Sequence, residues 1–278
     1  MLNLRQTERT QIRRDILKMV YNVKSGHPGG SLGCVEFFTS LYFEVLDYTE
    51  SFDMKGNHQD IFYLSNGHIS PVWYSTMARR GLMPVEDLAS FRKLNSRLQG
   101  HPTTAEHLDH VRIASGSLGQ GLSVACGHAI AKNMNGDPKT IFVLMGDGEL
   151  QEGQIWEAAL FAGSKNVNNL VGIIDLIGQQ IDGTVDSVVS LGDLRAKWES
   201  FGWEVIEADG NNYAELTTTL ITAKEYSNRK KPLCILMKTV MGKGVDFMEN
   251  NHKWHGSPPN KEQFEAAMAQ LPSTLKDF

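Results

Sequence analysis

Four histidines stand beside glycine in short polar segments, where imidazole can move protons or bind oxygen. The segments are SGHPGG, SNGH, GHP and WHG, and they contain His27, His68, His101 and His255. Imidazole titrates near neutral pH, and as a general acid or base it contributes on the order of 10² to 10⁴ in rate. A zinc site is the less favoured interpretation, because no pair has the spacing of ligands on one helix and no cysteine stands nearby. Proton transfer or hydrogen bonding to oxygen is therefore expected.

A carboxylate flanked by two glycines follows an apolar run at Gly146-Asp147-Gly148. Glycine lets backbone N–H groups approach a ligand's phosphates, and the carboxylate suits a hard cation such as Mg²⁺. A turn that ends a strand is the structural alternative, since Gly and Asp are common in turns. The segment GSLGQG at 116–121 leaves two similar interpretations open, a helix N-terminal turn or backbone donors to a phosphate.

Short apolar runs alternate with helix-length segments and would position these residues. The runs are 61–64, 141–145, 170–174, 203–206 and 233–237. Because they are apolar on both faces, they predict an α/β fold, a parallel sheet flanked by helices. Apolar spacing also predicts two opening helices, around 12–23 and 35–45, with SGHPGG as a loop between them. Ligands bind at the carboxyl ends of such strands, where SNGH, GDG and QQIDG follow.

Composition and charge exclude several classes of protein. The chain has 278 residues, 41% of them apolar and 21% charged, with a net charge of −5 and no block of like charges, so nucleic acid is not an expected partner. The N-terminal segment lacks the apolar core of a signal peptide, which predicts a cytoplasmic location with no membrane partner. Cys34, Cys126 and Cys234 are expected to be buried thiols. One domain over 1–278 is expected, with a short C-terminal tail from about 258.

Seven motifs together resemble a known family. They are, in order, SGHPGGSLG, SNGHISPVWY, QGHP, GSLGQGLS, GDGELQEGQIWEA, QQIDG and WHGSPP. Their order and approximate spacing resemble the amino-terminal, diphosphate-binding domain of transketolase over nearly the whole chain. The resemblance implies a thiamine diphosphate-binding fold, with thiamine diphosphate and Mg²⁺, or Ca²⁺ in its place, as cofactors.

The resemblance also implies roles for particular positions around the cofactor. Asp147 matches the carboxylate ligand of the metal, and the backbone carbonyl of Gln179 falls where the family supplies another ligand. The implied cofactor contacts, beyond these two, are His68, Gly116, Ser117, Leu118, Gly146, Gly148, Ile181 and His255.

The histidines and two acidic residues match catalytic positions of the family. His68 and His255 match histidines near the diphosphate and the reacting carbons, whereas His27 and His101 match those that hydrogen-bond the donor's oxygens. The acidic residues that match the proton network across the dimer interface are Glu152 and Glu157. For these two, the solvated face of a helix beginning near residue 151 is the open alternative.

The expected activity depends on a second polypeptide. Transketolases of the usual kind continue into domains that activate the aminopyrimidine and bind most of the sugar phosphate, and here the sequence stops soon after WHGSPP. The resemblance therefore implies the amino-terminal subunit of a split enzyme of the pentose phosphate pathway. With a C-terminal, pyrimidine-binding partner in an α2β2 heterotetramer, it would transfer a two-carbon ketol unit from a ketose phosphate to an aldose phosphate.

Ile177 departs from the family's pattern. This position, two residues before Gln179, normally carries an asparagine whose side-chain oxygen ligates the metal, and isoleucine has no donor atom. Water replaces the ligand, or the site is impaired, or the residue is an introduced substitution, and these three alternatives stay open.

Three other functions also stay open. The first is a split transketolase specialised for another sugar, such as a branched or sulfonated one. The second is the alpha subunit of a 2-oxoacid dehydrogenase, which shares the GDG element but not the histidine motifs. The third is a non-catalytic homologue that has lost its cofactor through the impaired metal site at Ile177.

Overall fold

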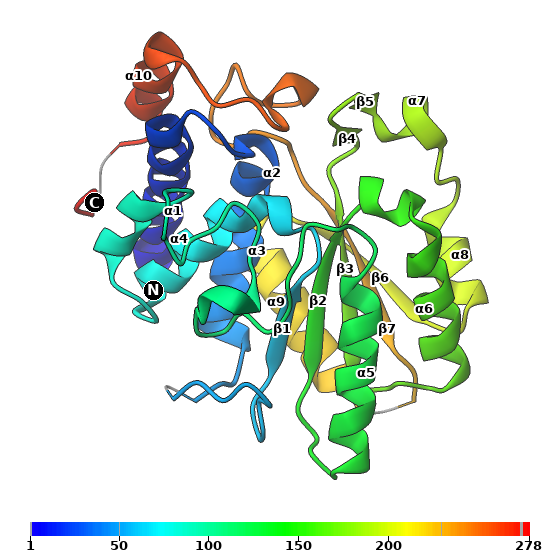
Figure 1. Ribbon diagram of the computed structural model, residues 1–278. Helices are drawn as coiled ribbons and strands as arrows, with labels where there is room; N and C mark the ends of the chain where they lie inside the picture. Colours follow the sequence, from blue (N-terminus) through cyan, green and yellow to red (C-terminus); the bar gives the residue numbers. More distant parts are fainter. Residues whose placement is uncertain (1, 50, 229, 273–274) are drawn as a thin grey trace.

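A five-stranded parallel sheet lies at the centre of the computed structural model, which describes residues 2–49, 51–228, 230–272 and 275–278 (Figure 1). The strand order is β1-β2-β3-β7-β6, and every neighbouring pair is parallel. The strands are β1 (Ile61–Leu64), β2 (Ile141–Gly146), β3 (Leu170–Leu176), β6 (Glu204–Asp209) and β7 (Leu233–Lys238). Each of the five predicted strands is present, and the predicted α/β fold is confirmed.

Both faces of the sheet are buried, which explains why the strands read as continuous apolar runs. In β2, Phe142 and Leu144 face one hydrophobic core, whereas Ile141, Val143 and Met145 face a second core on the opposite side. Successive side chains of a strand point to opposite faces, so a strand covered on both sides needs apolar residues at every position.

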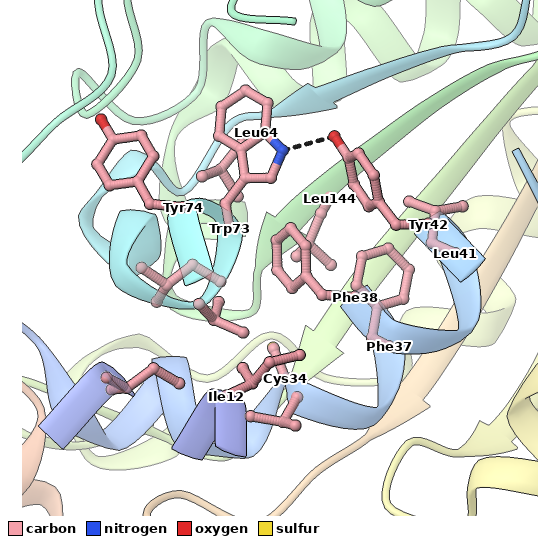
Figure 2. Packing of buried hydrophobic residues seen from close by; sticks show 14 of the residues in the cluster. Ile12, Cys34, Phe37, Phe38, Leu41, Tyr42, Leu64, Trp73, Tyr74 and Leu144 are labelled. Atoms are coloured by element: carbon pink, nitrogen blue, oxygen red, sulfur yellow. Dashed lines mark hydrogen bonds between the residues drawn. The ribbon is translucent and has the colours of Figure 1, made fainter. Parts of the chain in front are cut away.

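Helices of the N-terminal third, together with α9, cover the first face. They are α1 (Leu2–Val23), α3 (Val35–Ser40), α4 (Ser70–Arg80) and α9 (Tyr213–Tyr226). Figure 2 shows Phe37, Phe38 and Tyr42 packed beside Trp73 in this core. The indole Nε1 of Trp73 donates to the hydroxyl of Tyr42 at 2.5 Å, so the polar ends of both buried rings have a partner.

Three helices cover the second face. They are α5 (Gly121–Met134), α6 (Gly153–Ser164) and α8 (Leu194–Ser200). Trp198 and Trp203 pack here with ring centroids 4.8 Å apart, and Nε1 of Trp203 donates to the carbonyl of Ala159 at 2.8 Å. The two large rings therefore anchor α8 and the start of β6 to α6.

The SGHPGG segment is not the loop that the sequence predicts. Pro28–Gly33 forms helix α2, and 35–45 divides into α3 and a π-helical turn, η1 (Leu41–Val45). Pro28 starts α2 with a favourable fixed φ. A Cβ on Gly29 would lie 2.7 Å from Cγ of Met241 and 2.8 Å from the carbonyl oxygen of Trp254. Glycine here permits close packing, and tertiary contacts outweigh its low helix propensity.

The segment after residue 258, expected as a tail, contains a further helix, α10 (Lys261–Gln270). A capping box between Asn260 and Gln263 starts it. Phe264 stacks on Tyr21 of α1 with ring centroids 4.1 Å apart, so the end of the chain packs on its beginning.

The remaining elements are short and lie in the connections. They are η2 (Gly67–Ile69), η3 (Val85–Ser90), η4 (Thr104–Glu106), η5 (Gly148–Gln151), β4 (Gln179–Gln180), β5 (Gly183–Thr184), α7 (Val185–Val189) and η6 (His252–Trp254). All three cysteines are buried free thiols, as predicted. Among the described residues, no helix is both long and apolar enough to cross a membrane.

Candidate functional site

A cavity of about 380 Å³ opens where β1, β2 and β3 end. Its walls come from the loops after these strands, the start of α2, the β4–β5 hairpin and the segment after η6 (Figure 1). The predicted site residues that line it are His27, His68, His101, Gly116, Leu118, Gly146, Asp147, Gly148, Glu152, Gln179, Ile181 and His255. Ser117 and Glu157 are exposed and lie outside the lining.

Four histidine rings from four separate segments meet in this cavity. The ring centroid of His27 lies 5.1 Å from that of His68, 6.0 Å from that of His101 and 5.7 Å from that of His255. The rings of His68 and His255 are 5.0 Å apart. In the described part of the chain, the buried Nδ1 of His27 has no hydrogen-bond partner, so this ring has bonding capacity left for a ligand.

Burial keeps these imidazoles neutral. Desolvation, with the neighbouring His255 and Arg92, lowers the pKa of His27 to about 4. Desolvation also lowers the pKa of His68 and of His255, and together with the charge of Arg92 it lowers the pKa of His101. At pH 7 each neutral ring can donate one hydrogen bond and accept another, which suits contacts with sugar hydroxyl and carbonyl oxygens.

Asp147 is the buried anion of the cavity. Its Oδ1 accepts from the backbone N–H of Gly148 at 2.8 Å, and its Oδ2 accepts from that of Gly178 at 2.5 Å. Burial, and next the nearby carboxylate of Asp175, raise the pKa of Asp147 to about 7. A cation bound beside these two carboxylates would reverse that shift, because it favours their charged forms. Across the described residues, there is no group of three or more His, Cys, Asp or Glu side chains that could hold a metal ion.

Sequence reasoning missed Glu149, whose buried carboxylate joins three loops of the site. Its Oε1 accepts from the hydroxyl of Ser65 and from the backbone N–H of Gly119 at 2.8 Å, and its Oε2 accepts from the N–H of Gly146 at 3.2 Å. Burial raises the pKa of Glu149. The sequence signal for Glu149 was an acidic residue directly after GDG. A solvated turn residue fits that position equally well.

Two glycines of the predicted motifs are required by close packing between loops. A Cβ on Gly67 of SNGH would lie 2.5 Å from Oγ of Ser115 and 2.8 Å from the backbone nitrogen of Gly116. Gly116 itself has φ of +113°, and a Cβ there would lie 2.5 Å from Cδ2 of His101. These contacts hold the loops after β1 and before α5 against each other, which places His68 and His101 in one cavity.

A family model described as transketolase, thiamine diphosphate binding domain, matches residues 5–274. The chain belongs to the transketolase family. An apulose-4-phosphate transketolase subunit of Phocaeicola vulgatus is 36% identical over 95% of this chain and 92% of its own length. The 6-deoxy-6-sulfo-D-fructose transketolase subunit SqwG of Clostridium sp. is 35% identical over 96% of this chain and 95% of its own length.

Solved transketolases share the fold of this domain. The enzyme from Leishmania mexicana superposes with a TM-score of 0.86 and 31% identity over 96% of this chain, and that from Campylobacter jejuni with 0.85 and 31% over 97%. This chain covers 41% and 43% of their lengths, and 39% of human transketolase, to which it is 35% identical. The predicted transketolase resemblance is therefore confirmed, and the chain corresponds to the thiamine diphosphate-binding part of the longer transketolases.

Three further residues singled out in the sequence, Ile177, Glu152 and Glu157, lie at different distances from the centre of the cavity. Ile177 lines the cavity, and its Cδ1 would lie 3.4 Å from a Cβ on Gly33, so its side chain contacts α2. Glu152 lies at the rim of the cavity, whereas Glu157 lies exposed on α6.

Proposed function

We propose that this chain is the amino-terminal, thiamine diphosphate-binding subunit of a two-subunit transketolase. The assembled enzyme would transfer a two-carbon ketol unit from a ketose phosphate to an aldose phosphate. The observation that carries the proposal is the meeting of four neutral histidines with the buried Asp147 in one cavity. The names of two similar proteins, which are both transketolase subunits, support it further.

The cavity residues fit thiamine diphosphate and Mg²⁺ or Ca²⁺ at all but one position. The carboxylate of Asp147 would bind the cation together with the backbone carbonyl of Gln179. The backbone of Gly148 would meet the diphosphate, since without a side chain its N–H can come close to a phosphate oxygen. Ile177 is the exception, since it offers only methyl groups.

Other residues would contact the organic part of the cofactor. Leu118 and Ile181 line the cavity and provide apolar surface, and Ile181 is 63% exposed, so a bound ring or a partner subunit would cover it. Gly116 and Ser117 would lie along the cofactor on the loop before α5. The backbone of Gly146, which lines the cavity at the end of β2, would also contact the cofactor.

The histidines would handle oxygen and protons. Thiamine diphosphate, when bound, supplies the carbon nucleophile that protein side chains lack. His27 and His101 would hydrogen-bond the donor's oxygens, and His68 and His255 would stabilise charge near the diphosphate and the reacting carbons. Because the four rings are neutral at pH 7, each can accept a proton without first losing one to solvent, and each can donate a hydrogen bond from its N–H.

The partner would be a C-terminal, pyrimidine-binding transketolase subunit in an α2β2 assembly. Apolar side chains exposed on α5 and α6 support a protein interface: Val124 is 40% exposed, Leu160 53% and Phe161 47%. Glu157 of α6 lies on the same helix, so this interface would bring the proposed proton network of Glu152 and Glu157 to the partner.

The sugar is the open part of the proposal. Enzymes of the pentose phosphate pathway act on ordinary sugar phosphates in the cytoplasm, whereas the two similar subunits are named for apulose-4-phosphate and 6-deoxy-6-sulfo-D-fructose. All of these donors carry an anionic end group. We therefore propose a ketose with a terminal phosphate, and a branched or sulfonated sugar as the alternative donor.

A non-catalytic role is the second candidate, and Ile177 is the observation that favours it. One experiment separates the candidates. The purified chain is mixed with thiamine diphosphate, Mg²⁺, a ketose phosphate and an aldose phosphate, with and without a C-terminal transketolase subunit, and products are identified by mass spectrometry. Ketol transfer only with the partner supports the proposal. Absence of both cofactor binding and transfer supports the non-catalytic role, and turnover without a partner contradicts the split enzyme. In a parallel mixture that contains a 2-oxoacid in place of the sugars, CO₂ release indicates oxoacid chemistry.

A further inference from the structure

The β4–β5 hairpin forms one wall of the cavity, and the residue before it contacts Asp147. The N–H of Gly178 donates to Oδ2 of Asp147 at 2.5 Å, and the two residues that follow form β4, which pairs with β5. Both β4 residues are glutamines, Gln179 and Gln180, and both line the cavity. Each carries an amide oxygen, a hard and neutral ligand of the kind that Mg²⁺ and Ca²⁺ accept.

Two other side chains near Asp147 offer no free oxygen to a cation. Ile177 has none, and its Cδ1 lies against Gly33 of α2. Both carboxylate oxygens of Asp175 already accept hydrogen bonds, Oδ1 from the hydroxyl of Thr239 and Oδ2 from the thiol of Cys34 at 3.1 Å. A cation with six preferred oxygen positions therefore needs at least one further protein donor or an extra water.

The two glutamine amides lie on opposite sides of the hairpin strand, as successive residues of a strand do. Nε2 of Gln179 donates to the carbonyl of Asn250 at 2.8 Å, so this side chain is directed toward the segment before η6. Oε1 of Gln180 lies 2.9 Å from the point that a Cβ on Gly148 would occupy. Gly148 follows Asp147 directly, so the amide oxygen of Gln180 lies over the GDG element. Gln180 is half-buried in the lining of the cavity, and the buried Oε1 of Gln179 has no hydrogen-bond partner among the described residues.

We propose that the side-chain amide oxygen of Gln180 ligates the divalent cation and replaces the oxygen that residue 177 does not supply. The inference rests on the proposed function, because the cation is the one that holds thiamine diphosphate. Gln180 then completes an oxygen set with Asp147, and the site tolerates Ile177 because a neutral oxygen arrives from the neighbouring strand.

Calorimetric titration of the full chain with thiamine diphosphate tests the proposal, in Mg²⁺ and again in EDTA. We expect Gln180→Leu to weaken Mg²⁺-dependent binding about 10- to 100-fold, with little change in EDTA. Gln154→Leu changes a glutamine of α6 that lies outside the cavity lining and serves as the matched control, with affinity near the parent value. Gln180→Glu keeps an oxygen at the same reach and should retain Mg²⁺-dependent binding.

Rescue gives the sharper test. We expect Ile177→Asn to restore the affinity for thiamine diphosphate in the Gln180→Leu background and to add little in the parent. Effects of this kind, which do not add, would show that either position can supply the same metal ligand. Equal affinity of Gln180→Leu and Gln154→Leu overturns the proposal. A loss for Gln180→Glu as large as for Gln180→Leu, and equally large in EDTA, overturns it in favour of an amide N–H that binds the diphosphate.

Failure of the proposed function and failure of the Gln180 ligand give different results. A parent chain that binds no thiamine diphosphate with Mg²⁺ contradicts the proposed function and the Gln180 ligand together. A parent that binds tightly while Gln180→Leu binds equally contradicts the ligand alone. Circular dichroism and the urea midpoint of each variant, close to those of the parent, show that the compared chains are folded.

Discussion

Glu149 offers the most direct test of how the site is assembled, because one buried carboxylate joins three loops. It is 2% exposed and accepts hydrogen bonds from Ser65, Gly119 and Gly146. Glu149→Ala removes the acceptor of all three donors and leaves them buried. Each buried donor without a partner costs about 1 to 3 kcal/mol, and neighbouring losses do not add fully, so we expect the free energy of unfolding to fall by about 3 to 5 kcal/mol.

Glu149→Gln separates the contribution of the acceptors from that of side-chain volume. The glutamine oxygen can take the place of Oε1 and keep the bonds from Ser65 and Gly119, whereas its NH₂ then faces the N–H of Gly146. The N–H of Gly146 and the glutamine NH₂ then both lack an acceptor, so we expect a loss of about 2 to 3 kcal/mol.

Urea unfolding followed by circular dichroism measures both variants, and Glu157→Gln is the control because this glutamate is exposed on α6. The control should change stability by less than about 0.5 kcal/mol. Thiamine diphosphate affinity should fall for Glu149→Ala, since the loops after β1 and before α5 lose their common tie. The reasoning is refuted if Glu149→Ala unfolds at the same urea concentration as Glu157→Gln.

The remaining predictions concern the histidines and the glycines. In the assembled enzyme, His101→Ala should lower donor kcat/KM while cofactor affinity stays near that of the parent. His68→Ala should lower donor kcat/KM and also weaken cofactor binding. Identical calorimetric affinities and kinetic constants for the two variants would contradict these separate roles. Burial lowers the pKa of His27 from 6.5 to about 4, so between these two pH values the imidazole is protonated in the unfolded state and neutral in the folded state. Stability should therefore fall as the pH decreases from 6.5 towards 4, and His27→Gln should reduce that slope by up to about 1.4 kcal/mol per pH unit in urea unfolding; an unchanged slope would refute it. Gly67→Ala should lower the free energy of unfolding by about 1 to 3 kcal/mol through overpacking. Gly127→Ala, in helix α5 where a Cβ meets nothing within 4 Å, should raise it by about 0.5 to 1 kcal/mol. Equal effects of the two variants in thermal or urea unfolding would contradict the steric argument.

Strand positions and fold class could be predicted from the sequence because they depend on local patterns. Runs such as 141–145 are apolar at every position, and only burial on both faces of a sheet accounts for that pattern. The motifs that end the strands were visible for a similar reason, since glycine beside histidine or aspartate is informative without knowledge of distant contacts. The order of the strands in the sheet and the helix at Lys261–Gln270 did not follow from these patterns.

The Pro28–Gly33 helix shows where local reasoning fails. Three glycines in SGHPGG predict a loop from their intrinsic propensity, yet the segment is helical because α2 packs closely against Met241 and the backbone of Trp254. Those partners lie more than 200 residues further along the chain. Propensity is a weak preference of about 1 kcal/mol for each glycine, and close packing between distant segments exceeds it.

The residue types of the site were determined by the sequence, whereas their chemical state was decided by the tertiary structure. Histidines and Asp147 could be named from motifs, but the displacement of the pKa of His27 to about 4 and that of Asp147 to about 7 arises from burial and from neighbours brought together by folding. Glu149 and Gln180 gained their importance in the same way, one by accepting from two other loops and the end of β2, and the other by lying over Gly148. A hydrogen bond or a charge interaction depends on distances of a few ångströms, and only the packed sheet and its loops set those distances between residues far apart in the chain.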